Sequence, residues 1–529
     1  MVGLQRPWDL RTYTGTMLAL LTGRSCAYGY GTIDRFLAQL AQTAAPNALT
    51  AMLAQWATRL WHPDHLGYLL PGPLYLDGHK KPVYSDVLVP RGRIGRTGKI
   101  LGCRSLTVLH DAAGHPLAVT TARGDAHLTT TIPPLLQQYE AATGSFARLL
   151  IMDREGMSGD FLAALVAQQH VVVTLLRRDQ YTGLASFTDI GPFTPFQVTA
   201  AGQVLREVAR ARYRLTVPSQ PTQPVLLQCA LIRDYRGCAP GAPDAGTPAM
   251  TGCLTEPRLI SIVTTGAMER PETLVEWYTG RWPAQENHFK LWLLPLGLDV
   301  NAGFQKTAVP NSEAAKRQAR CAKQAVRLRE QAATAGATLA QRQAEVATAQ
   351  RIATSAADLV PLVRAADRVQ AQQQADALQA AVDMATDRVA AAEHTRAQVA
   401  LAQQAVAQRQ ADLAQAPPMF ELDNQQDQVM TVLKLCAANL GMWVRDQFFG
   451  ADYAQAGWTR LRPFFALPGQ IRVTEDRTVV TLQGFNDQQR NRDLDALCQR
   501  VRERQPKLPD GTTLVFERAD RGRVSLDTD

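Results

Sequence analysis

The sequence predicts an α/β protein in which one mixed sheet is accompanied by a long helical hairpin. Strand-like apolar runs alternate with helical stretches over residues 71–176 and resume at residue 257, which is the pattern of a mixed α/β sheet. Residues 312–416 consist largely of Ala, Gln and Arg, a composition that favours long helices. With 529 residues, the chain is long enough for two or more folding units.

Charge and cysteine usage restrict the functional classes. The formal net charge is +8, which favours a polyanionic partner over an acidic one. The eight cysteines contain no Cys-x-x-Cys pair, so neither a disulfide framework nor a zinc knuckle is expected, and a reducing cytoplasm fits best. No apolar run approaches the roughly 18 to 20 residues of a membrane helix, and no leader is recognisable. We therefore expect a soluble cytoplasmic protein without a membrane partner.

The N-terminal region, residues 1–70, is predicted to be helical. Residues 33–44 and 48–61 carry apolar side chains at helical spacing, and Pro46 separates them. Several arginines give the region a basic character. Two interpretations stay open: a small DNA-binding module, or a helical cap packed on the next domain.

The core is predicted from residues 71–176 together with residues 257–310. The predicted elements are strands at 74–77, 105–110 and 116–121, a helix at 132–142, a strand at 149–152, a helix at 159–169 and a strand at 171–176. Asp77 would end the first strand and Asp153 would follow the fourth. Ligands and catalytic groups gather at strand ends in open α/β sheets.

The regions after this core differ in composition. Residues 177–256 are rich in Pro, Gly and Thr and alternate in polarity, which predicts a β-rich insertion. The core pattern resumes with a strand at 259–265 and a helix opened by Pro271. Residues 417–529 predict a small closing α+β unit, with a helix near 425–449, strands at 470–473 and 479–482, and a helix at 493–504.

Residues 311–416 are predicted to form an antiparallel helical hairpin. Pro361 should divide the region into two helices of about 45 to 55 residues each. The start of the first helix, residues 316–329, carries six basic residues and no acid. Such a run is by default a solvated face, and contact with a DNA backbone is the second interpretation.

Three acids are candidates for metal-dependent chemistry. Glu286 lies among aromatic and basic residues in the stretch 278–290, and Asp77 and Asp153 lie at predicted strand ends. Two Asp and one Glu can hold two Mg²⁺ or Mn²⁺ ions, which activate a nucleophile and stabilise a leaving oxygen during phosphoryl transfer. One such acid alone would be a turn or cap residue. Glu155 and Glu276 are fallback ligands.

A basic segment adjoins Asp77. Residues 80–104 contain seven basic residues, one acid and four glycines. Such a segment can follow a phosphate backbone, and the alternative is a flexible solvated hairpin. The candidate DNA-binding residues in it are Lys80, Lys81, Arg91, Arg93 and Arg96.

The motifs occur in an informative order: Tyr-Leu-Asp-Gly-His, then Met-Asp-Arg-Glu-Gly-Met-Ser, then a β-rich insertion, then Tyr-x-x-Arg-Trp with Glu-Asn-x-Phe-Lys. This order resembles the DDE transposases of bacterial insertion sequences that carry a Tyr-Arg-Glu-Lys signature. The resemblance implies a ribonuclease H-like core that cuts and joins DNA, a metal-binding triad of Asp77, Asp153 and Glu286, a homodimer on double-stranded DNA, and a nucleoid-associated location. It also implies transposon-end contacts from Tyr278, Arg281 and Lys290.

The last motif departs from the family pattern by one residue. The position four residues after Arg281 is Gln285, and the carboxylate follows at Glu286. Pro283 disfavours helix at Trp282, so a break there could absorb the offset and turn Glu286 towards the other two acids. The alternatives to an active transposase are an inactive transposase-derived DNA-binding or scaffolding protein and a related metal-dependent nuclease.

Overall fold

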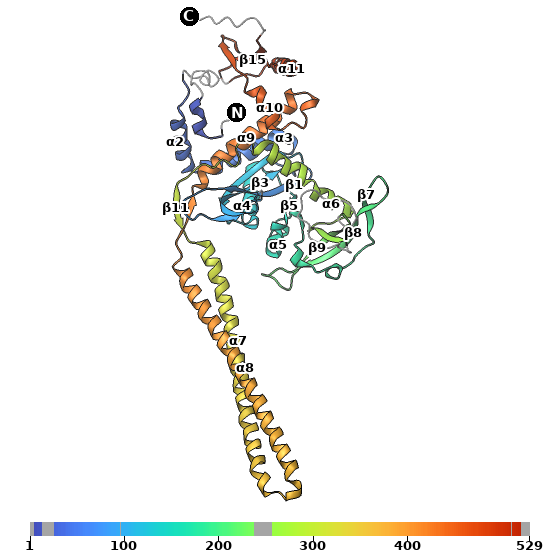
Figure 1. The fold of residues 1–529 in the computed structure, drawn as a ribbon. Coiled ribbons are helices and arrows are strands. Elements are labelled where there is room, and N and C mark those ends of the chain that lie inside the picture. The colour runs from blue at the N-terminus through green and yellow to red at the C-terminus, as the bar shows by residue number, and fades with distance from the viewer. Residues whose placement is uncertain (1–4, 13–25, 96, 237–256, 509, 520–529) are drawn as a thin grey trace. The chain divides into compact units, whose positions relative to one another are not determined.

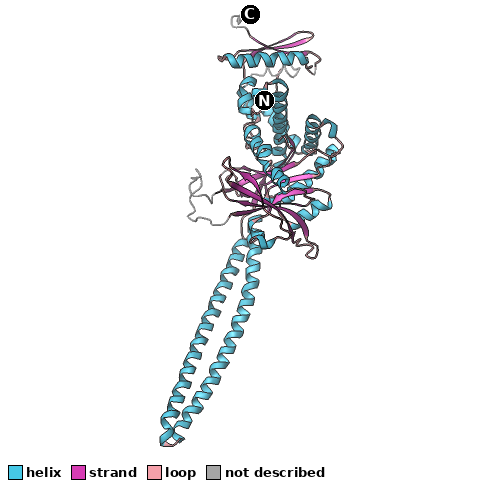
Figure 2. Ribbon diagram, turned by 90° about the vertical axis from the view of Figure 1, so that its right-hand side faces the viewer, coloured by secondary structure: helices cyan, strands magenta, loops and turns pink. Residues whose placement is uncertain are grey.

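The computed structural model describes residues 5–12, 26–95, 97–236, 257–508 and 510–519 (Figure 1). The chain divides into two compact units, of which the first contains residues 1–307 and 421–529 and the second contains residues 308–420. The strands of one large sheet lie in the first unit, whereas two long helices build the second (Figure 2). No helix in the described ranges is long and apolar enough to cross a membrane.

The centre of the first unit is a mixed sheet. Its first strands form an antiparallel meander, followed by two strands parallel to the first one. One helix crosses from the meander to the parallel pair, and a second helix connects the two parallel strands. These elements are β1 (Leu74–Pro82), β3 (Ile100–His110), β4 (Pro116–Arg123), α4 (Leu128–Thr143), β5 (Leu149–Met152), α5 (Gly159–Ala167) and β6 (Val171–Leu175).

The basic, Gly-rich segment of residues 80–104 begins and ends in strand, and residues 83–90 within it are irregular. β1 extends to Pro82, and β2 (Arg91–Arg93) pairs with the first residues of β3. Gly102 lies close to Val89, and an added Cβ atom there would meet the Val89 side chain at 2.4 Å. Glycine is therefore needed at Gly102 for close packing.

The β-rich region extends the same sheet. β10 (Arg258–Thr264) pairs antiparallel with β6, and β9 (Val225–Asp234), β8 (Val204–Leu215) and β7 (Thr194–Val198) follow in that order. Residues 237–256 of the predicted insertion lie outside the described residues. The sheet therefore continues through these strands without a break in its hydrogen bonding.

Different helices cover the two faces of the sheet. α6 (Pro271–Thr279) packs on one face against an apolar cluster that includes residues of β5, β6, β8, β9 and β10. On the other face, α3 (Ala45–Trp61), α4 and α9 (Asn424–Phe448) share a larger cluster with residues of β1, β3 and β4. α2 (Tyr30–Ala41) packs beside α9. The helices of residues 30–61 thus pack on the core, as the helical-cap interpretation expects.

The C-terminal part of the first unit contains helices and a small sheet. β14 pairs antiparallel with β13 and parallel with β15, and this last strand was not expected from the sequence. The elements are α10 (Trp458–Phe465), β13 (Gly469–Val473), β14 (Arg477–Leu482), α11 (Gln488–Arg504) and β15 (Thr513–Arg518).

The second unit is a helical hairpin of α7 (Ser312–Leu359) and α8 (Arg368–Ala414), and Pro361 lies in the connection between them. The 48 residues of α7 span about 72 Å. Buried residues of the seam include Cys321, Leu328 and Val406. The short strands β11 (Lys306–Val309) and β12 (Met419–Leu422) pair at the base of the hairpin.

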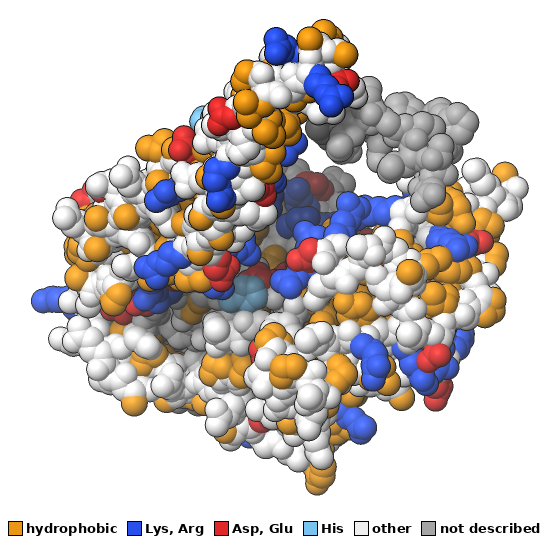
Figure 3. All heavy atoms as spheres, turned by 90° about the horizontal axis from the view of Figure 1, so that it is seen from below, with side chains coloured by type: hydrophobic (Ala, Val, Ile, Leu, Met, Phe, Trp, Pro, Cys, Tyr) orange, Lys and Arg blue, Asp and Glu red, His pale blue; other side chains and the backbone are white. Residues whose placement is uncertain are grey.

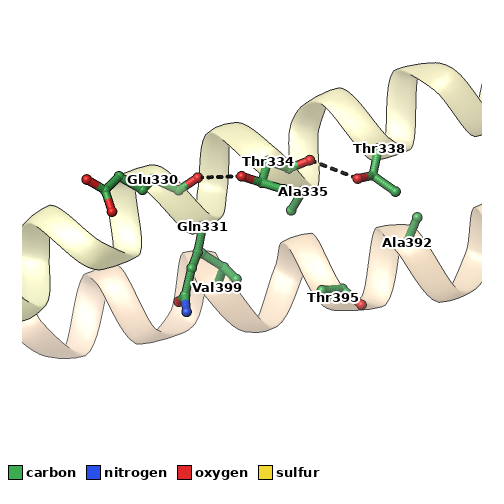
Figure 4. A pocket seen from close by; sticks show the side chains of 8 residues that line it. All are labelled: Glu330, Gln331, Thr334, Ala335, Thr338, Ala392, Thr395 and Val399. Carbon is green, nitrogen blue, oxygen red and sulfur yellow. Dashed lines mark hydrogen bonds between the residues drawn. The ribbon is translucent and has the colours of Figure 1, made fainter.

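A hollow between α7 and α8 shows how thin this seam is (Figure 4). It is lined mainly by small side chains, among them Ala335, Ala392 and Thr395. The hydroxyls of Thr334 and Thr338 donate to backbone carbonyls four residues earlier in their own helix. Because these polar groups are satisfied within α7, we interpret the hollow as a packing gap between Ala-rich helices.

Candidate active site

The register of two parallel strands brings Asp77 and Asp153 side by side. Leu76 of β1 lies beside Met152, the last residue of β5, and an aspartate follows each of them. Neighbouring strands lie roughly 4.8 Å apart. The prediction that Asp77 ends its strand is wrong, because β3 pairs with β1 as far as Pro82. Asp153 does follow the end of its strand.

Alternation along the strands directs both carboxylates to the face that α6 covers. Tyr75 and Ile151, two residues before the aspartates, are buried in the same apolar cluster as Leu274 of α6. Side chains two positions apart on a strand point to the same face. Asp77 and Asp153 therefore lie on the α6 side of the sheet.

Arg281 lies between these two aspartates as a buried cation. The residue is 5% exposed, and its Nη2 and Nη1 atoms lie 3.9 Å from Asp77 Oδ2 and 3.5 Å from Asp153 Oδ1. The Tyr278 hydroxyl lies 3.4 Å from Asp153 Oδ1 and accepts a hydrogen bond of 3.2 Å from Arg281 Nη1. Tyr278 and Arg281, which the resemblance assigns to transposon-end DNA, thus contact the acids here, and their contact with DNA stays a prediction.

The electrostatics of Asp77 connect all three acids. Burial raises the pKa of Asp77 to about 6, and the charges of Asp153 and Glu286 act in the same direction. The Arg281 guanidinium and the Gly78 N–H, which donates to Asp77 Oδ1 at 2.8 Å, oppose this rise in pKa. The same three carboxylates, together with Tyr278, raise the pKa of Arg281 against the effect of its burial. The charge of Glu286 therefore acts on both Asp77 and Arg281.

The helix that carries Glu286 widens after α6. α6 ends at Thr279, and residues 282–286 form a π-helical turn in which the Asn287 N–H bonds to the Trp282 carbonyl, five residues earlier. The predicted break at Trp282 and Pro283 is thus corrected, because the chain stays helical with one extra residue in the turn. Pro283 has no N–H with which to continue α-helical bonding, and π-helical turns often occur at functional sites.

This turn separates the environments of Gln285 and Glu286. Gln285 is fully buried, and its amide nitrogen lies 3.5 Å from the His110 ring, whose pKa burial lowers to about 3. Glu286 is half-buried and acts electrostatically on Asp77. Gln285 is therefore buried beside His110, whereas Glu286 is the residue whose charge acts on Asp77.

The two fallback acids lie elsewhere. Glu155 Oε1 accepts a hydrogen bond from the Leu128 N–H at the start of α4 and lies 3.6 Å from His127 Nε2. Glu276 is exposed on α6. Glu155 is thus occupied at a helix start.

The lysines predicted to bind DNA next to Asp77 are engaged within the protein. Lys81 is fully buried, with its ammonium 2.7 Å from Asp427 Oδ1, so the prediction of a DNA contact at this residue is wrong. Lys80 Nζ donates to the Ser105 hydroxyl and to the carbonyls of Gly124 and Ala126. Both ammonium groups therefore stabilise the fold.

The remaining predicted DNA-binding residues lie nearer the surface. Arg93 on β2 and Lys290 after the π-helical turn are exposed, and Arg91 is half-buried. Arg96 lies outside the described residues. Arg93 and Lys290 are the predicted cations that can contact a phosphate from the surface without a change in the protein.

His79 is a polar residue near the site that the sequence did not single out. It follows Asp77 by two positions on β1, so the two side chains share a face. Its Nε2 atom lies 2.6 Å from Asp299 Oδ1, and its ring packs against Phe289. His79 itself was visible in the Asp-Gly-His motif. Its partner Asp299 follows 220 residues later in the chain, so the sequence gives no sign of the pair.

The three acids are of the donor type that a hard divalent cation needs, but their carboxylates are not spaced to hold one. Carboxylate oxygens suit Mg²⁺ and Mn²⁺. Within the described ranges, however, no group of three or more His, Cys, Asp or Glu side chains could hold a metal ion. The Arg281 guanidinium contacts both aspartates and supplies the positive charge instead. Binding of an ion between these two aspartates would therefore require Arg281 to withdraw.

Comparison with known proteins adds little. No protein-family model and no curated protein sequence matches the chain. One solved structure with local similarity is the cryo-EM structure of a piggyBac transposase synaptic complex with hairpin DNA, at 10% identity and a TM-score of 0.23. The match covers 42% of this chain and 40% of that chain. A TM-score this low supports no argument about fold or activity.

Proposed function

We propose that the protein is a metal-dependent DNA transposase with a ribonuclease H-like core. The observation that carries the proposal is the position of Asp77 beside Asp153 on adjacent parallel strands, with the charge of Glu286 acting on Asp77. An antiparallel meander followed by two parallel strands, with an acid on β1 and another directly after β5, supports the ribonuclease H-like assignment. The substrates would be double-stranded transposon ends and target DNA, bound by a homodimer.

The three carboxylates would hold two Mg²⁺ or Mn²⁺ ions. Such ions activate a water or a 3′-hydroxyl and stabilise the leaving oxygen in phosphoryl transfer. The pKa of about 6 keeps Asp77 mostly ionised at neutral pH, as a ligand must be. Arg281 balances the acids in the free protein and would turn to a DNA phosphate once another cation replaces it.

A second candidate function rests on the position of Arg281. Its guanidinium lies between Asp77 and Asp153 and is almost completely buried. If this arrangement persists on DNA, the protein binds DNA without cutting it and acts as a transposase-derived scaffold. The two candidates differ in one measurable property, which is metal-dependent cleavage.

The decisive experiment is Mg²⁺-dependent cleavage of the terminal repeats that flank the gene, with the full chain. We expect cleavage by the wild type and loss of cleavage in Asp77→Ala, Asp153→Ala and Glu286→Ala. Glu276→Ala is the matched control, because it removes an exposed acid from α6. Equal activity of the wild type and Asp153→Ala would eliminate the triad. DNA binding without cleavage by the wild type would support the scaffold.

A further inference from the structure

We propose that one face of α7 in the second unit binds the phosphate backbone of double-stranded DNA. Four basic residues that we call the basic stripe form this face: Lys316, Arg320, Lys323 and Arg327. All four side chains are exposed. Their spacing of four, three and four residues places them on one side of an α-helix. At about 100° per residue, the four positions fall within a sector of roughly 60°.

The basic stripe points away from the partner helix. The residues of α7 that are buried against α8 near this stretch are Cys321 and Leu328. These positions lie roughly 120° around the helix from the centre of the stripe. α7 therefore packs against α8 with one side and exposes the basic stripe on another side.

The basic stripe contains no acid of its own, and Glu313 and Glu330 flank it on α7. No acid occurs between residues 316 and 329, and within the described part of the chain no ion pair links a stripe residue to an acid. The distal part of the hairpin differs, since Arg342 lies 2.6 Å from Glu345 and acids occur at Asp376, Asp383 and Asp387. A face that is only exposed to solvent would have no need to keep its basic residues apart from acidic ones.

The dimensions of the basic stripe suit a nucleic-acid duplex. It spans the twelve residues from Lys316 to Arg327, a length of about 16 Å. B-DNA carries one charge per roughly 1.7 Å of its axis, so about ten phosphate charges lie along this length. The intervening side chains are mainly Ala and Gln, with Val326 as an exposed apolar residue, and they lack the Trp, Phe and Leu that anchor a basic helix in a membrane surface. Duplex DNA is therefore the partner that this chemistry fits best.

The contact should be independent of base sequence. Hydrogen bonds and ion pairs to phosphates position a protein on DNA but carry no sequence information. Over the face drawn in Figure 3, Lys and Arg side chains cover more of the surface than Asp and Glu side chains, in keeping with the net charge of +8. The proposal uses none of the three acids, so it stands or falls separately from the proposed catalysis.

The test measures the salt dependence of duplex binding by the full chain. Each phosphate contact contributes about 0.9 to the slope of log affinity against log salt concentration. The variant Lys316→Gln, Arg320→Gln, Lys323→Gln, Arg327→Gln should therefore lower the slope by about 3.6. Between about 50 and 200 mM salt, the wild type should then lose roughly 100-fold more affinity than this variant.

A second variant controls for charge alone. It carries Arg351→Gln, Arg364→Gln, Arg368→Gln and Arg388→Gln, which remove four exposed arginines from the distal part of the hairpin. We expect it to keep the wild-type slope. An unchanged slope in the stripe variant, or an equal fall in both variants, would overturn the proposal. Tighter binding of double-stranded RNA or anionic vesicles through the same four residues would also overturn it.

Two further measurements keep folding and catalysis apart from this result. Far-UV circular dichroism checks that the stripe variant keeps its helical signal. If the signal is lost, the single variants Arg320→Gln and Arg327→Gln replace that variant in the test. Each of them should lower the salt slope by about 0.9. Cleavage by the wild type is measured alongside binding. If the wild type does not cleave DNA but the stripe variant lowers the salt slope of binding, the proposed catalysis is refuted. The proposed DNA-binding face of α7 then still stands.

Discussion

Replacement of Asp77 by asparagine should stabilise the protein while removing its proposed activity. The folded protein holds the Asp77 proton more tightly than an unfolded chain does, because its pKa is about 6 instead of 3.8. The ionised carboxylate therefore costs stability above pH 6, and this cost falls as the pH drops towards 3.8. An amide resembles the protonated carboxyl in shape and can still accept the Gly78 hydrogen bond.

The magnitude follows from the pKa difference. A difference of about 2.2 pKa units corresponds to about 3 kcal/mol at about pH 8 and to about 1 kcal/mol at about pH 4.5. The Asp77 side chain is 23% exposed, so most of this effect should survive solvent screening. Asp77→Asn should therefore raise the free energy of unfolding by up to about 3 kcal/mol at the higher pH and by about 1 kcal/mol at the lower.

The assay is urea denaturation of the wild type and Asp77→Asn at both pH values. Addition of Mg²⁺ provides a second measurement, because an ion at about 100 times its Kd stabilises the folded state by about 2.7 kcal/mol. We expect this stabilisation in the wild type and its loss in Asp77→Asn. A destabilised Asp77→Asn at about pH 8, or a stability difference that does not change with pH, would refute the reasoning about Asp77.

Two other predictions test the π-helical turn and the buried ion pair. Pro283→Ala restores an N–H that can continue α-helical bonding and turn Glu286 by roughly 100°, so we expect cleavage to fall roughly 100-fold. Pro271→Ala, at the first position of α6, should leave cleavage unchanged. Asp427→Asn should lower the free energy of unfolding by roughly 3 to 5 kcal/mol in urea denaturation, because Lys81 and Arg104 lose a buried counterion. A loss no larger than that of Asp452→Asn, at an exposed residue, would contradict the structural role of this pair.

The pKa of Asp77 also illustrates a conflict between function and stability. Three carboxylates near one another are unfavourable unless a cation compensates them. In this protein Arg281 provides that compensation from the helical segment that also carries Glu286. The cation that stabilises the free protein is thus the one that must leave before a metal ion can bind between the aspartates.

Much of the architecture could be predicted from local features of the sequence. Apolar runs and helical periodicity indicated β5, α5 and β6, because these short elements are specified by their own residues. Ala, Gln and Arg, interrupted by Pro361, indicated two long helices, since propensity and a single proline act locally. The chemical character of Asp77, Asp153 and Glu286 was likewise visible in their motifs.

Long-range pairing decided the remainder. The length of β1 depends on β3, so Asp77 lies within a strand although its local sequence resembled a strand end. Lys81 is buried because Asp427, 346 residues away, supplies its counterion. The strands of residues 177–256 join the core sheet because β10 pairs with β6, which alternation of polarity alone cannot specify.

The sequence by itself determined which groups are available: three carboxylates, an arginine between aromatic residues, and a run of basic residues without an acid. Only the tertiary structure decided their positions. The β1 and β5 register sets Asp77 beside Asp153, and the π-helical turn buries Gln285 but leaves Glu286 half-buried. Strand register and helix phase depend on contacts between distant segments, which is why a one-residue offset in the motif could be interpreted only with the fold in hand.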